Sequence, residues 1–178
     1  MPYPVIKRIV KKDNYYQHIE VLKRNRYKRF KNQQFFVEGV EVINQAINNN
    51  WEIDSFVYNR EKELSDWAKD ILANSTAKTH YEMNKELMET FSDKNDSSEL
   101  MAIIKMPENN LDKIKTKENP MIMVFDRPSN LGNLGTIIRS CDAFKVDGLI
   151  ITGHCVDLYD PKVIRSSLGA IFSIITIS

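Results

Sequence analysis

The sequence has 178 residues, of which 42% are hydrophobic, and its 25 basic and 24 acidic side chains leave a net charge of +1. A chain of this length can bury one medium core or two small ones without the help of a disulfide bond. Cys141 and Cys155 are therefore expected to be reduced thiols. No apolar run reaches the roughly 20 residues that span a bilayer, and the first residues lack the apolar core of a signal peptide, which predicts a soluble, cytoplasmic protein. No cysteine or histidine shows the spacing of a metal site, and no metal is predicted.

The net charge conceals an asymmetry along the chain. Residues 1–31, the cationic arm, carry ten basic and two acidic side chains, whereas the remaining residues carry 15 basic and 22 acidic ones. Phosphate contacts release counterions and supply most non-specific affinity for nucleic acid, so the arm predicts a polyanionic partner. Aromatic residues that could stack on bases are interleaved with these cations, namely Tyr15, Tyr16, Tyr27 and Phe30. The alternative is a solvated helix face without a partner.

The first hundred residues alternate between strand and helix patterns. Tyr15, Ile19 and Leu22 recur at helical spacing and predict a helix with one apolar stripe. Short apolar runs then predict four strands, and stretches with helical spacing between them predict further helices; the strands cover 34–37, 53–58, 79–83 and 100–104, and the helices cover 42–47, 64–72 and 85–91. This alternation predicts a compact α/β domain over residues 1–107.

A polar segment flanked by prolines, residues 108–119, is the predicted linker to a second domain over 120–178. The run 121–125 predicts a buried parallel strand, which opens into a loop over 126–135. Residues 136–144 predict a helix whose Ile137, Cys141 and Phe144 face inward. A strand at 149–152, a helix at 161–167 that begins with proline, and a final strand at 170–177 complete the predicted elements.

The order strand, glycine-containing loop, helix builds a general anion-binding device, because helix N-terminal amides point outward and glycine admits a ligand close to the backbone. Gly132 and Gly135 supply only part of a dinucleotide fingerprint, although an acidic residue, Asp157, follows at about the expected 20 positions. A dinucleotide-dependent enzyme therefore stays open as an alternative. So does a tight turn with no ligand.

The loop and helix sequence, residues 126–140 (DRPSNLGNLGTIIRS), resembles the first motif of the SpoU (TrmH-like) ribose methyltransferase family, in which an asparagine is followed six positions later by an arginine. Asn133 and Arg139 hold those two places. The stretch 157–170 is similar to the continuation of that family, and residues 26–29, 35–41, 87–98 and 101–104 are similar to its substrate-binding domain. The resemblance implies an α/β protein, with a small ribosomal-protein-like RNA-binding domain followed by the N-terminal part of a parallel-sheet SPOUT (trefoil-knot) methyltransferase domain.

The resemblance further implies methyl transfer from S-adenosylmethionine to a ribose 2′-hydroxyl of ribosomal or transfer RNA, within a homodimer. Arg139 and Asn133 are then the expected catalytic residues. A guanidinium is effectively always protonated, so Arg139 is better suited to clamp phosphate and stabilise developing alkoxide charge than to act as a base, and Asn133 could hold the arginine or the ribose. The alternative for Arg139 is a surface cation paired with Asp142 at i+3.

The expected RNA-binding residues are cations of the arm together with one cation near the end of the chain: Lys23, Arg24, Arg26, Lys28, Arg29 and Arg165. The family sequence continues past the position of Ser178 into two further motifs that form most of its cofactor pocket. No residue of this sequence is therefore assigned to S-adenosylmethionine, and we expect the chain alone to bind it weakly or not at all. A non-catalytic RNA-binding module is the second hypothesis.

Overall fold

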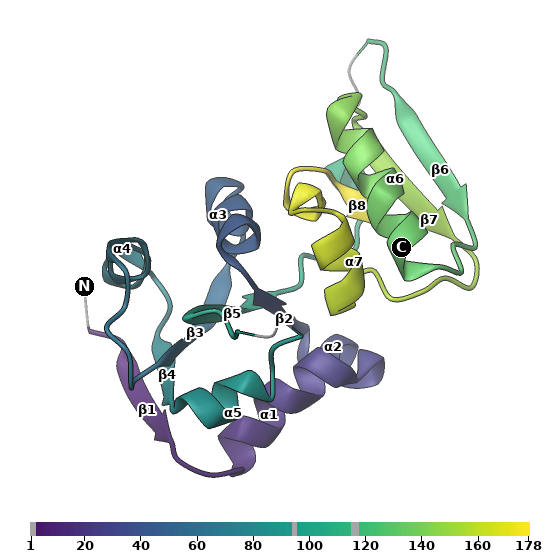
Figure 1. Ribbon diagram of the computed structural model, residues 1–178. Helices are drawn as coiled ribbons and strands as arrows, with labels where there is room; N and C mark the ends of the chain where they lie inside the picture. The colour runs from purple at the N-terminus through teal and green to yellow at the C-terminus, as the bar shows by residue number, and fades with distance from the viewer. Residues whose placement is uncertain (1–2, 94–95, 115–117) are drawn as a thin grey trace.

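A computed structural model describes residues 3–93, 96–114 and 118–178, and Figure 1 shows two sheets with their helices. The strands are β1 (Val5–Ile9), β2 (Gln34–Glu38), β3 (Ile53–Asn59), β4 (Thr79–Met83), β5 (Leu100–Lys105), β6 (Ile122–Asp126), β7 (Gly148–Thr152) and β8 (Thr176–Ile177). The helices are α1 (Asn14–Arg24), α2 (Arg26–Asn32), α3 (Val40–Asn48), α4 (Asp66–Asn74), α5 (Lys85–Glu89), α6 (Leu131–Ala143) and α7 (Pro161–Ser166), with 3-10 turns η1 (Leu111–Lys113) and η2 (Ala170–Phe172). Part of the predicted linker, residues 115–117, lies outside the described residues.

The first sheet has the order β1-β4-β3-β5-β2, in which β1, β4 and β3 are parallel and β5 runs antiparallel to β3 and β2. Helices α3 and α4 cover one face and α1 and α5 cover the other (Figure 1). Side chains of β2 point alternately to the two faces of the sheet, so this strand contributes to the cores on both sides. Phe35 and Val37 enter the core beneath α3, and Phe36 enters the core beneath α1. This sheet places α1 and α2 at the edge that faces the second sheet.

The second sheet, β6-β7-β8, is parallel throughout and carries α6 and α7. Parallel strands joined through helices produce this arrangement. The predicted fold class, a mixed α/β chain with a parallel sheet in its second part, is confirmed. Within the described ranges, no helix is long and apolar enough to cross a membrane, and no group of three or more metal-ligating side chains lies together.

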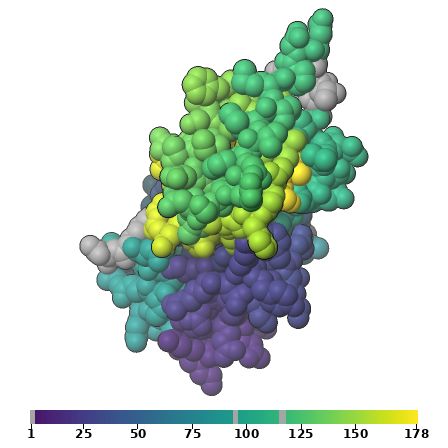
Figure 2. Space-filling model, turned by 90° about the vertical axis from the view of Figure 1, so that its right-hand side faces the viewer, coloured from purple at the N-terminus to yellow at the C-terminus, as the bar shows by residue number. Residues whose placement is uncertain are grey.

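The two sheets share one continuous apolar core. The Phe35 ring packs against the rings of Tyr159 and Phe172, with centroids 4.7 and 6.3 Å apart, and Trp51 meets Phe172 edge-on at 5.0 Å. The indole Nε1 of Trp51 also donates to the carbonyl of Phe172 at 3.0 Å. Figure 2 shows the α1–α2 region in direct contact with the part of the chain that carries α7. Because these contacts are extensive and apolar, the first sheet, with α1 and α2 packed on it, has a fixed position relative to α6 and α7.

The secondary structure differs from the prediction in three places. Strand β1 was not predicted, because Lys7 and Arg8 interrupt its apolar run at an exposed edge of the sheet. Helix α6 begins at Leu131 rather than at 136, since the side chain of Asn130 caps it. The predicted strand 170–177 is instead the 3-10 turn η2 followed by the two-residue strand β8, because Gly169 adopts a left-handed conformation with φ of +84°.

Two burial predictions were also wrong. Phe144, expected to face inward, is 74% exposed. Cys141 is buried as expected, and it shares the buried stripe of α6 with Leu134 and Ile138. The strand β6 was expected to be buried, but it is an edge strand whose residues are mostly exposed. Its apolar sequence resembles that of a covered parallel strand, but Ile122, Met123 and Val124, which alternate between the two faces, are all exposed in the structure.

His80 on β4 is buried against Phe56, and neither of its ring nitrogens has a hydrogen-bond partner among the described residues. Desolvation penalises the charged imidazolium, so burial lowers the pKa of His80 below its ordinary value of 6.5. As the pH falls below 6.5, the unfolded chain takes up a proton at this position before the folded chain does. The contribution of His80 to the free energy of unfolding is therefore fully present above pH 6.5 and decreases as the pH falls below that value.

We expect His80→Leu to remove this part of the pH dependence. Urea unfolding at pH 7.5 and pH 5.5 should show a loss of stability on acidification in the wild type and a smaller loss in the variant. An equal loss in both proteins would mean that other groups cause the acid sensitivity.

Candidate functional site

The loop after β6 is held in a defined conformation. The Oδ1 atom of Asn130 accepts a hydrogen bond from the backbone N–H of Asn133 at 3.0 Å and so caps α6. The carbonyl of Pro128 accepts one from the N–H of Val156 at 2.9 Å, which ties the loop to the segment after β7. Arg127 adopts a φ of +48°, and its Nε donates to Asp126 at 2.7 Å. The start of α6 is thus fixed before any ligand binds.

A cavity of about 590 Å³, the cationic cleft, lies between the turn from α1 to α2 and the start of α6. Its lining residues come from these two elements, from the segment before α7 and from the first turn of α7: Arg24, Arg26, Arg29, Ser129, Asn130, Leu131, Gly132, Val156, Asp157, Asp160 and Lys162. Arg24, Arg26 and Lys162 are exposed. The guanidinium of Arg26 donates to the carbonyl of Cys155 at 2.7 Å, across the cleft from its own helix. Exposed cations on both walls make this cleft suitable for a phosphate backbone.

Arg29, predicted to bind RNA, is not available for that role. Its side chain is 2% exposed and forms an ion pair with Asp157, whose side chain is 5% exposed. The prediction was wrong because the partner of Arg29 lies 128 residues away and cannot be identified from local pattern. The same ion pair removes the dinucleotide alternative, since Asp157 is buried and cannot present its carboxylate to a ribose.

Two further predicted cations meet at Asp93, outside the cationic cleft. Lys23 donates to the Asp93 carboxylate at 2.8 Å and to the carbonyl of Phe91 at 2.5 Å, and its side chain is only 10% exposed. The guanidinium of Arg165 lies 3.5 Å from the same carboxylate and is half exposed. The hydrogen bond from Lys23 holds the pKa of Asp93 below its ordinary value. Lys23 is therefore used internally, and Arg165 keeps an exposed face.

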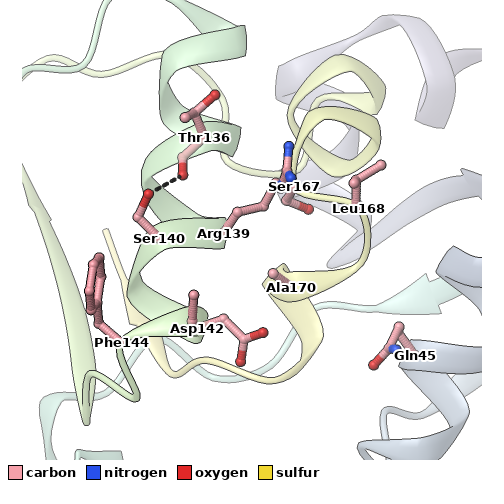
Figure 3. A pocket seen from close by; sticks show the side chains of 10 residues that line it. Gln45, Thr136, Arg139, Ser140, Asp142, Phe144, Ser167, Leu168 and Ala170 are labelled. Carbon is pink, nitrogen blue, oxygen red and sulfur yellow. Dashed lines mark hydrogen bonds between the residues drawn. The ribbon is translucent and has the colours of Figure 1, made fainter.

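A second cavity, of about 470 Å³, lies along α6 and is called here the Arg139 cavity. Arg139 extends from α6 toward Ser167, and Leu168 and Gln45 form the opposite side (Figure 3). Asp142 does not pair with Arg139 within the part of the chain that the structure describes; its Oδ1 accepts from the Ser173 hydroxyl at 2.7 Å. The alternative of a local ion pair on the helix surface is thus not observed.

Asn133 lies in the first turn of α6 and is exposed. It lines neither cavity, and among the described residues no hydrogen bond joins its side chain to Arg139. Lys28, another predicted RNA contact, is half-buried on α2 and lies outside both cavities. Lys162 was not among the predicted RNA-binding residues, because only the fold shows that it faces Arg24 and Arg26 across one cleft.

Comparison with known families agrees with this arrangement. Residues 13–102 match the SpoU L30e-like domain, and residues 120–177 match the SpoU rRNA Methylase family. The first match contains α1, α2, the strands β2, β3 and β4 and the start of β5. The second contains the residues of α6 and of the turn after α7 that line the Arg139 cavity. The chain belongs to the SpoU methyltransferase family.

Particular relatives extend this result. The chain is 38% identical over 173 residues to the 23S rRNA (uridine(2479)-2'-O)-methyltransferase of Streptomyces viridochromogenes, a match that covers 96% of this chain and 60% of that protein. It is 28% identical over 149 residues to the human mitochondrial rRNA methyltransferase 3, covering 81% of this chain and 34% of that protein. The chain therefore spans at most about 60% of the length of these relatives.

Solved structures give the same picture. The crystal structure of the SpoU methyltransferase AviRb from Streptomyces viridochromogenes in complex with AdoMet superposes with a TM-score of 0.82 at 36% identity, covering 93% of this chain and 61% of that one. An AdoMet-bound rRNA methyltransferase from Sinorhizobium meliloti has a TM-score of 0.84 at 23% identity, covering 97% of this chain and 64% of that one, and it supports the fold.

Proposed function

We propose that the protein transfers a methyl group from S-adenosylmethionine to a ribose 2′-hydroxyl of ribosomal RNA. The observation that carries the proposal is the cationic cleft. In it, exposed Arg24 and Arg26 face Lys162 and the loop between β6 and α6, residues 127–130, which belongs to the SpoU motif and is called here the motif loop. The activity for which the Streptomyces relative is named, 2'-O-methylation of 23S rRNA, supports the substrate and the position methylated. We assign RNA binding to residues 1–107 and methyl transfer to residues 120–178, joined by residues 108–119. We further propose that the protein acts as a homodimer, as the resemblance implies, and that it does so in the cytoplasm, as the sequence pattern predicts.

The reaction requires a weakly acidic hydroxyl to lose its proton as its oxygen attacks the methyl carbon. When bound, S-adenosylmethionine supplies that methyl group on a sulfonium, which is a good leaving group. No described residue is assigned to the cofactor, because both cavities present a guanidinium, which repels a sulfonium. The cavities fit the RNA side of the reaction instead.

Arg139 is the proposed catalytic residue. Its guanidinium remains charged, so it can hold the phosphate next to the target ribose and stabilise negative charge that develops on the 2′-oxygen. Its exposure and the lack of an ion pair with Asp142 leave it available for this role. Asn133, in the first turn of the same helix, is proposed to orient the ribose, since no contact supports a role in holding Arg139.

Charge reversal in the cationic cleft tests the RNA-binding part of the proposal. The triple variant Arg24→Glu, Arg26→Glu, Lys162→Glu should bind a ribosomal RNA hairpin more weakly, and the slope of log affinity against log salt should fall by about 3, one unit for each lost phosphate contact. A filter-binding titration between low and moderate salt measures both quantities.

The matched control reverses three exposed lysines that line neither cavity, Lys62, Lys69 and Lys78. This control has the same change in net charge. It should retain more of the RNA affinity than the cleft variant and most of the dependence of affinity on salt. Equal losses in the two triple variants would show that RNA responds to net charge alone and not to the cleft.

A further inference from the structure

The ion pair between Arg29 and Asp157 joins the cationic arm to the segment that leads into α7. Nε and Nη2 of Arg29 donate to the Oδ2 atom of Asp157 at 2.7 and 2.5 Å. Nη2 also lies 3.6 Å from the carboxylate of Asp160. The pair is almost completely removed from solvent and lies at the base of the cationic cleft.

Both partners are fixed by additional hydrogen bonds. Nη1 of Arg29 donates to the carbonyls of Leu22 and Lys23 at 2.9 and 2.8 Å, which are in the last turn of α1. The second carboxylate oxygen of Asp157 accepts from the backbone N–H of Tyr159 at 2.9 Å. The planar guanidinium therefore connects three points in one geometry: the end of α1, its own helix α2, and the segment before α7.

The residues held by this pair belong to the two walls of the cleft. On one wall, Arg24 and Arg26 flank the turn between α1 and α2, directly beside the carbonyls that Arg29 binds. On the other wall, Val156 next to Asp157 donates to the carbonyl of Pro128 in the motif loop. A change in the ion pair would therefore alter the distance between the arm cations and the loop that begins α6.

Stability alone does not explain an ion pair at this position. Removing two charges from water is costly, and well-packed apolar side chains of similar size are often as stabilising as a buried ion pair or more so. What an apolar pair cannot reproduce is the fixed direction of five donors in a plane.

We propose that Arg29 and Asp157 are positioning residues, which set the separation between Arg24 and Arg26 on one wall and Lys162 and the motif loop on the other, so that one RNA backbone engages both walls. This inference rests on the proposed function. Neither residue touches the RNA itself. Their effect is exerted through the relative placement of groups that do.

The test compares Arg29→Met, Asp157→Leu and the double variant. Each single variant leaves a buried charge without its partner and should lower the Tm by on the order of 10 °C, whereas the double variant should regain most of that loss. The double variant should nevertheless bind the ribosomal RNA hairpin about tenfold more weakly than wild type, with a salt slope reduced by about 1. Adding Lys162→Ala should cost less affinity in the double variant than in wild type.

Arg29→Lys provides a second variant that keeps the buried charge. Lysine can pair with Asp157 but cannot also reach both α1 carbonyls in one plane, so its RNA affinity should fall even where its Tm is close to wild type. As a control, Lys69→Ala with Glu63→Ala removes an exposed pair and should change neither quantity.

The inference would be overturned if Arg29→Lys, or a double variant with restored Tm, kept the RNA affinity, the salt slope and the sensitivity to Lys162→Ala of the wild type. The ion pair would then be a packing feature only. A wild-type chain that does not bind the hairpin would instead contradict the proposed function. The two failures are therefore distinguishable.

Discussion

Replacing Arg139 with alanine is expected to lower the rate of methyl transfer by about 10²- to 10³-fold while the protein remains folded, as for the loss of one group that stabilises transition-state charge. Arg139 extends across an open cavity toward Ser167 and contributes nothing to the buried stripe of α6 (Figure 3). Alanine is also a better helix former than arginine, so the Tm should change little. Arg139→Lys should keep part of the activity, because lysine retains the charge but loses the planar fork.

The assay compares methyl transfer to ribosomal RNA and thermal unfolding in wild type and both variants, using the protein as the cell makes it. Lys145→Ala is the matched control, since it removes another exposed cation just beyond the end of α6. Wild-type turnover in Arg139→Ala would exclude Arg139 from the chemistry. A large drop in Tm in that variant would show a structural role instead.

Gly135→Ala is expected to destabilise the fold by about 1–3 kcal/mol, because α6 and α7 touch at this position. A Cβ atom built at Gly135 would lie 2.7 Å from the Cβ and 2.9 Å from the backbone carbonyl carbon of Ser166, which are distances that real side chains do not adopt. The helix propensity that alanine gains over glycine, about 1 kcal/mol, offsets only part of this cost. Separation of the two helices would also disturb the Arg139 cavity, which is lined by α6 and by the turn that follows α7.

Gly132→Ala is the matched control in the same helix. Its added Cβ would meet only the side-chain oxygen of Asn130, at 3.3 Å, so the free energy of unfolding should change by less than about 1 kcal/mol. Urea unfolding of both variants measures the difference. Equal stability of the two would mean that the helices can separate at little cost, and that the close packing at Ser166 does not constrain α6.

The elements of the first sheet were largely predictable because their apolar spacing is local. Strands β2 to β5 and helix α3 follow period-two and helical patterns that need no tertiary information. Strand β1 was missed because an edge strand tolerates charged residues such as Lys7 and Arg8, which interrupt its apolar pattern. The start of α6 was misplaced because Gly132 and Gly135 predict a loop, whereas in the fold Gly135 is required by the approach of Ser166.

The site was predictable only in part, since its geometry depends on contacts between distant segments. Arg139 and Asn133 were identified through the family resemblance and not through any local physical signal. The cationic arm correctly indicated a basic surface, yet composition could not distinguish the exposed Arg24 and Arg26 from Arg29, which is buried by Asp157. Lys162 was missed for the same reason, because it joins the cleft from the other end of the sequence.

The decisive measurement is the transfer of a labelled methyl group from S-adenosylmethionine to ribosomal RNA by the protein as the cell makes it, with the RNA digested to nucleosides to locate the label. We predict that the label is found on a ribose 2′-oxygen. Incorporation should be reduced in the triple variant Arg24→Glu, Arg26→Glu, Lys162→Glu and nearly lost in Arg139→Ala. Tight RNA binding without incorporation would contradict the proposed activity and favour a non-catalytic RNA-binding module. Label on a base would contradict the proposed site of methylation.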